Sequence, residues 1–102
     1  HNHVLRIQTV AQGTPHSVEV STREIMREAL VHGATSLILV HNHPFGCPEP
    51  SEEDIRTTEE LILIAWKLGI RIVEHLIIGQ KGSYSFCEAG RLEALQARVS
   101  RA

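Results

Sequence analysis

Two short clusters hold the side chains best suited to chemistry, His41-x-His43 and Ser51-x-x-Asp54. In an extended chain, residues two apart point to the same side, so both imidazoles can reach one ion. Residues three apart share a face of a helix, so the side chains of Ser51 and Asp54 can both point toward the histidines. Two neutral imidazoles and one carboxylate leave the fourth position of a tetrahedral zinc ion open for water. Zinc lowers the pKa of that water to about 7, so the pattern predicts a hydrolytic zinc site.

A second interpretation of Ser51-x-x-Asp54 is purely structural. The pair is close to a capping box, in which an acidic residue at the third helical position satisfies the start of a helix. A lone His-x-His pair is likewise more often not a metal site. The two clusters together, at a strand end and a helix start, favour the metal interpretation over the cap.

The composition limits the function classes. The chain has 102 residues, which fits one domain with one modest core. A net charge of −2 argues against a strongly basic nucleic-acid-binding domain. No apolar run approaches the length of about 18 residues that spans a membrane. Cys47 and Cys87 lie far apart and suggest no disulfide framework, so we expect a reducing, cytoplasmic setting.

Periodicity and turn signals divide the chain into alternating elements. We expect strands over 4–10, 18–20, 37–40, 70–78 and 84–86. We expect helices from Ser21 or Thr22 to about His32, from the Ser51 cap to about Leu68, and from Glu88 to about Val99. Gly33 and Gly69 should end the first two. The inward side chains of these two helices are predicted to be Ile25, Met26, Ala29 and Leu30, then Ile55, Ile62, Ala65 and Trp66.

The strand over 37–40 is continuously apolar, as in a strand that is buried on both faces. Alternating helices and strands with a terminal hairpin then imply a three-layer α/β/α domain with a mixed sheet. The carboxyl edge of such a sheet is where α/β proteins place their sites, and His41 and His43 follow the buried strand there.

The chain opens directly on a strand, with no preceding helix or cap. We therefore expect residues 1–102 to be a single domain that lacks its first strand. The strand next to the missing one would have an unpaired edge, open to pairing with a second copy in a homodimer.

The motif His41-x-His43-Pro44, a stretch from Pro44 to Pro50, and Ser51-x-x-Asp54 resembles the JAMM motif of the MPN metalloproteases. The surrounding sequence resembles the bacterial RadC family from about Val4 to Gly90. The recurring segments are Gly13-Thr14, Arg23-Glu24-Ile25, Ala29-Leu30, His41-Asn42-His43-Pro44, Pro50-Ser51 and His75-Leu76-Ile77-Ile78-Gly79.

This resemblance implies the mixed-sheet fold shared with cytidine deaminases, with His41, His43 and Asp54 as zinc ligands. It implies that Ser51 stabilises the water or an oxyanion. JAMM enzymes also use an upstream glutamate as general base, which we expect before the first strand seen here. Two positions depart from the usual pattern: Phe45 replaces a small serine, and Glu74 replaces an aspartate.

Other candidates have less specific interpretations. Glu19 is the alternative general base, whereas Glu24 and Glu28 read as solvated charges on a helix. We interpret His75 as a hydrogen-bonded structural histidine and Cys47 as an incidental loop residue.

Three function classes compete for this sequence. The first is a zinc hydrolase that cleaves an amide or isopeptide bond of a protein or peptide. A zinc deaminase is excluded because it needs His-x-Glu and Pro-Cys-x-x-Cys, which the chain lacks. The third is a non-catalytic module that keeps the zinc site and binds DNA or a repair complex, in line with the family's DNA-repair label. Its candidate basic face, which acidic residues interrupt, comprises Arg23, Arg27, Arg56, Lys67 and Arg71.

Overall fold

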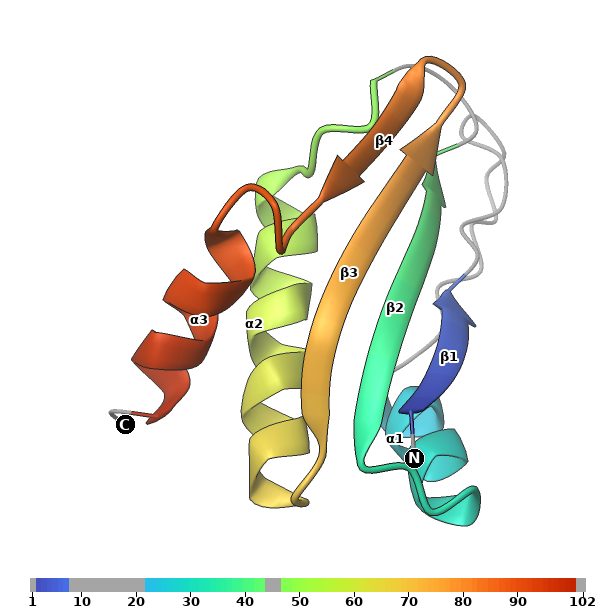
Figure 1. The fold of residues 1–102 in the computed structure, drawn as a ribbon, viewed down its shortest axis with the longest axis vertical. Helices are drawn as coiled ribbons and strands as arrows, with labels where there is room; N and C mark the ends of the chain where they lie inside the picture. The colour runs from blue at the N-terminus through green and yellow to red at the C-terminus, as the bar shows by residue number, and fades with distance from the viewer. Residues whose placement is uncertain (1, 8–21, 44–46, 101–102) are drawn as a thin grey trace.

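The computed structural model describes residues 2–7, 22–43 and 47–100 (Figure 1). Within these residues, four strands form one sheet in the order β1-β2-β3-β4. β1 (Asn2–Ile7), β2 (Ser36–His43) and β3 (Arg71–Gly79) are parallel, and β4 (Gly82–Ser85) is antiparallel to β3. This confirms an α/β domain with a mixed sheet. Residues 8–21, which include the strand expected over 18–20, lie outside the described residues.

β2 is an interior strand that carries the histidines, and it is longer than its apolar run. Its pairing with β1 ends where His41 lies opposite Ile7, but its pairing with β3 continues, with His41 opposite Ile77. His43 still lies opposite Gly79 of β3. The two histidines are therefore the last residues of a paired strand rather than the start of a loop.

The helices are α1 (Thr22–Val31), α2 (Glu52–Lys67) and α3 (Arg91–Ser100). Gly33 and Gly69 follow α1 and α2 with φ of 64° and 74°, a conformation that glycine adopts without strain. α3 begins three residues later than expected because residues 86–90 form turns. Phe86 closes them by accepting hydrogen bonds from the main-chain nitrogens of Arg91 and Leu92. None of the described helices is long and apolar enough to cross a membrane.

The core lies between one face of the sheet and the helices. Leu37 and Leu39 of β2 and Ile72 and Ile77 of β3 are buried there with the inward residues of all three helices. α1 and α2 line a common groove, and α2 packs against α3 and β3. On the opposite face Ile38 and Val40 are only partly buried. Over its apolar run, β2 is thus fully buried on one face only. A third layer, which would cover the second face of the sheet, is not seen among the described residues and stays a prediction.

Two predicted core residues, Leu30 and Trp66, are exposed, at 56% and 63% of their surface. At about 100° per residue, Leu30 lies roughly a quarter-turn from the buried face of α1, which is centred on Ala29 and Ile25. Trp66 lies equally far from the stripe that faces the sheet, which comprises Thr58, Leu61, Ile62 and Ala65. Both predictions were wrong because each residue sits at the edge of its helix's apolar face.

Candidate metal centre

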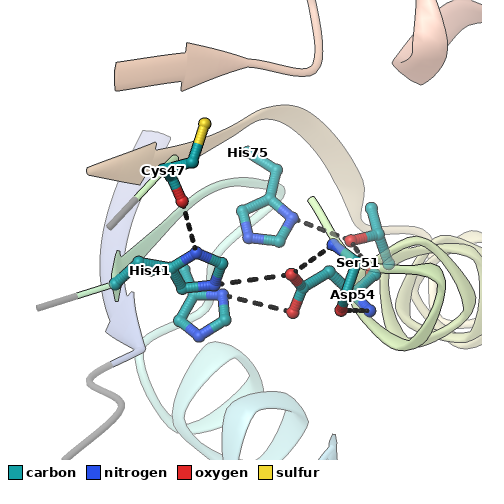
Figure 2. A network of polar contacts seen from close by, with 7 residues as sticks. His41, Cys47, Ser51, Asp54 and His75 are labelled. Atoms are coloured by element: carbon teal, nitrogen blue, oxygen red, sulfur yellow. Dashed lines mark hydrogen bonds and ion pairs between the residues drawn. The ribbon is translucent and has the colours of Figure 1, made fainter. Parts of the chain in front are cut away.

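The end of β2 and the first turn of α2 bring three potential ligands together (Figure 2). His41 and His43 share the sheet face of Leu37 and Leu39, because side chains alternate along a strand. Asp54 projects toward them from the start of α2. The ligand atoms of the three side chains all lie within 4.8 Å of one another. The structure thus unites all three residues that the sequence singled out as ligands.

The distances within this cluster suit a tetrahedral ion. His41 Nδ1 lies 3.7 Å from Asp54 Oδ1, and His43 Nε2 lies 3.4 Å from Asp54 Oδ2. Both separations are long for hydrogen bonds between nitrogen and oxygen. Two ligand atoms about 2.0–2.1 Å from a tetrahedral zinc ion are about 3.3 Å apart, close to both values. The donor set and its spacing therefore fit zinc.

Asp54 also completes a capping box with Ser51, so the structural interpretation of this pair is confirmed. The Asp54 main-chain nitrogen donates to Ser51 Oγ over 3.0 Å, and the Ser51 main-chain nitrogen donates to Asp54 Oδ2 over 2.9 Å. These bonds satisfy two main-chain donors at the start of α2. They also fix the carboxylate in the orientation that faces the histidines.

His43 is held from its other side by the loop that connects β2 to α2. Its Nδ1 lies 3.4 Å from the main-chain oxygen of Cys47, close enough for a long hydrogen bond. A proton on Nδ1 leaves Nε2, the atom nearest Asp54, as the one with a lone pair for a metal. The Cys47 thiol is exposed, and this residue contributes to the site through its main chain.

Burial favours the neutral form of the His41 imidazole. Loss of solvent lowers the pKa of His41 below its ordinary value of 6.5; the Asp54 carboxylate opposes this effect, and His43 adds to it. A lowered pKa means that the imidazole is neutral at neutral pH. The neutral form is the one that binds a metal ion, so fewer protons have to be displaced.

Below the cluster, His75 of β3 is buried against α2. It shares the sheet face of His41 because a bulge in β3, between the residues paired with Leu37 and Ile38, shifts the alternation. Thr58 Oγ1 lies 2.8 Å from His75 Nδ1 and donates to the main-chain oxygen of Asp54, also over 2.8 Å. His75 is thus a hydrogen-bonded, buried histidine, as predicted. Thr58 was not predicted as a site residue, because its only signal in the sequence is its position four residues after Asp54.

The metal-free chain is expected to lose stability as the pH falls from about 6.5 to about 4. Burial, and then His41, lower the pKa of His75 from 6.5 to about 4. Below pH 6.5 the unfolded chain therefore takes up a proton that the folded chain does not. The contribution of neutral His75 to the free energy of unfolding is fully present above pH 6.5. It falls by roughly 3 kcal/mol as the pH is lowered to about 4. Urea unfolding at several pH values measures it, and His75→Phe should flatten the curve; an unchanged slope would contradict the assignment.

The remaining sequence candidates lie away from the cluster or outside the described residues. Glu24 and Glu28 are exposed on α1, as expected for solvated charges. Glu74 accepts hydrogen bonds from the main-chain nitrogens of His75 and Cys87 and from Ser85 Oγ, so it ties β3 to β4 and the turn before α3. Glu19 and Phe45 fall in the undescribed segments.

A comparison with protein families agrees with the geometry. The family model of the RadC-like JAB domain matches residues 1–91. This match includes all of β1 to β4, the three cluster residues and His75. It confirms the resemblance that the sequence motifs indicated. The chain belongs to the RadC-like JAB domain family.

Proposed function

We propose that this domain is a zinc-dependent hydrolase of the JAMM type that cleaves an amide or isopeptide bond. The observation that carries the proposal is the convergence of His41, His43 and Asp54 at zinc-like spacing. Bound zinc supplies a Lewis acid that polarises a carbonyl group and makes hydroxide available at neutral pH.

The number of protein ligands supports a catalytic rather than a structural ion. Structural zinc sites use four protein ligands, whereas catalytic sites use three and keep one position open. The cluster offers three within the described residues. Their side chains are 13–14% exposed, so the site reaches the surface without being fully solvated.

Ser51 is proposed to stabilise the water or the oxyanion that forms on the substrate. Its Oγ already accepts a hydrogen bond from the Asp54 main-chain nitrogen. A hydroxyl group has one donor and two acceptor positions, so this bond leaves its proton available to a substrate oxygen. The hydroxyl is fixed by the cap beside the carboxylate, which spares the reaction the cost of orienting it.

We expect Ser51→Ala to keep the metal and lose activity. Losing the N-cap should cost about 1 kcal/mol, so the domain still folds. Losing one oxyanion donor should lower kcat by about 10²–10³. Metal content and hydrolysis rate are measured on the same sample, with Ser51→Thr as the control that keeps a hydroxyl group. Loss of zinc from Ser51→Ala would show that Ser51 supports the ligands instead.

The proton-accepting glutamate is proposed to lie outside the described residues. Glu19 is the candidate within the chain, and a glutamate before β1 is the expectation from the family resemblance. General base catalysis contributes roughly 10²–10⁴-fold, so its loss leaves a metal-binding protein with little activity. Glu19→Gln tests the candidate: unchanged activity excludes it, and loss of activity with retained metal assigns it.

The test of the function is a hydrolysis screen of the protein against peptide, isopeptide and nucleic-acid substrates, with and without a chelator. The proposal expects cleavage of a peptide or isopeptide bond that the chelator stops and zinc restores. Cleavage that survives both the chelator and His43→Ala would contradict it. Steeply salt-dependent DNA binding without hydrolysis would instead support the non-catalytic alternative.

A further inference from the structure

We propose that His75 is a positioning residue of the metal centre: it holds His41 and the first turn of α2, which carries Asp54, in the arrangement that binds the ion. This inference rests on the proposed metal site but not on the hydrolytic activity. Three features of the buried imidazole carry it.

The first feature is a stack of rings that ends at a ligand. The His75 ring lies nearly parallel to Phe86, with centroids 4.6 Å apart and planes at 12°. On the metal side it stacks against His41, with centroids 6.1 Å apart and planes at 24°. Phe86 is fully buried, so the stack is anchored in the core. The plane of the His41 ring is thereby supported from beneath.

The second feature is a chain of hydrogen bonds that reaches the other ligand. A threonine hydroxyl has one proton, and Thr58 donates it to the main-chain oxygen of Asp54. The 2.8 Å contact between Thr58 Oγ1 and His75 Nδ1 then requires the proton of that bond to be on Nδ1. His75 therefore donates to Thr58, and Thr58 donates to Asp54. This chain sets the position of the first turn of α2 relative to β3.

The third feature is the unsatisfied nitrogen of the same ring. His75 Nε2 is buried and has no hydrogen-bond partner among the described residues. Leaving such a group unpaired in a core is destabilising, and leucine or phenylalanine at this position would avoid that cost. Packing alone would therefore favour an apolar side chain over histidine at this position. Figure 2 shows the ring beside the cluster, where it can serve the ligands.

The experiment uses Co²⁺ as the probe, because its visible absorption reports coordination geometry and its binding needs no substrate. Three substitutions separate the contributions. His75→Phe keeps a ring for stacking but loses the hydrogen bond, and His75→Asn keeps a donor near Nδ1 but loses the ring. Thr58→Val removes the hydroxyl group at nearly constant shape. Ile72→Ala is the matched control, since Ile72 is buried on the same face of β3 but away from the ligands.

We expect His75→Phe and Thr58→Val each to weaken Co²⁺ binding 10–100-fold and to change the absorption spectrum. The double substitution should be no worse than either single one, because both break the same chain. Ile72→Ala should lower stability but leave the Co²⁺ affinity and spectrum unchanged.

Parent-like affinity and spectrum in both His75→Phe and Thr58→Val would overturn the inference. So would equal weakening in Ile72→Ala, because the effect would then follow stability alone. If His75→Phe fails to fold, Thr58→Val decides the question. Failure of the parent protein to bind Co²⁺ would overturn the metal site itself, whereas metal binding without hydrolysis would overturn only the proposed activity.

Discussion

Adding zinc to the metal-free chain is expected to raise its free energy of unfolding. Removal of one ligand should abolish this increase. An ion that binds only the folded state adds about 2.7 kcal/mol to the free energy of unfolding at 100 times its Kd. His43→Ala removes one imidazole of the cluster while leaving the Ser51–Asp54 cap in place. Urea unfolding with zinc and with a chelator measures the gain for the parent protein and for this variant.

Glu53→Gln is the control for charge in the same region. Glu53 is an exposed acid in the first turn of α2, next to Asp54 in sequence but outside the cluster. We expect this variant to keep the full gain from zinc. Equal loss in Glu53→Gln would mean that the ion is attracted by the acidic turn in general, and a parent-like gain in His43→Ala would remove His43 from the site.

Phe86→Ala is expected to destabilise the domain by about 3–5 kcal/mol, whereas Trp66→Ala should cost less than about 1 kcal/mol. Phe86 is fully buried and packs against both His75 and Tyr84, so its removal leaves a cavity under the metal centre. Trp66 is 63% exposed and loses little packing. Side-chain size alone would predict the larger loss of stability for Trp66→Ala, since tryptophan is the larger residue. The difference in burial predicts the opposite order.

Urea unfolding of both variants in the presence of a chelator separates core packing from metal binding. Phe86→Leu provides a milder control that fills most of the space and should cost less than Phe86→Ala. A cost for Trp66→Ala equal to that of Phe86→Ala would show that Trp66 is buried in solution and that α2 is oriented differently from the structure.

The candidate ligand set could be predicted from the sequence because each half of it depends on local geometry. Alternation along a strand places His41 and His43 on one side whatever the rest of the fold does. The preference for serine at an N-cap starts α2 at Ser51 and puts Asp54 in its first turn. Glycine similarly ends α1 and α2, at Gly33 and Gly69. The fold then has to bring these two local patterns together, and only eight residues of sequence separate the end of β2 at His43 from the start of α2 at Glu52.

The support beneath the ligands was not predictable in the same way. His75 faces the core only because a bulge in β3 shifts the alternation, and simple alternation from Ile72 would have placed Glu74 there instead. The contact with Thr58 joins residues 17 positions apart through packing of α2 on the sheet. The prediction that Trp66 faces the core was wrong because it also depends on packing between elements. An apolar side chain does not by itself show where the buried face of a helix ends.

His41, His43 and Asp54 are expected to bind one metal ion together, and elemental analysis of dialysed protein measures this binding without any substrate. The parent protein, His41→Ala, Asp54→Ala and Glu53→Ala are each loaded with zinc, dialysed and analysed for zinc per folded chain. We expect one zinc ion per chain in the parent protein and in Glu53→Ala, and clear loss in the other two variants. A full zinc ion retained by folded His41→Ala or folded Asp54→Ala would contradict it.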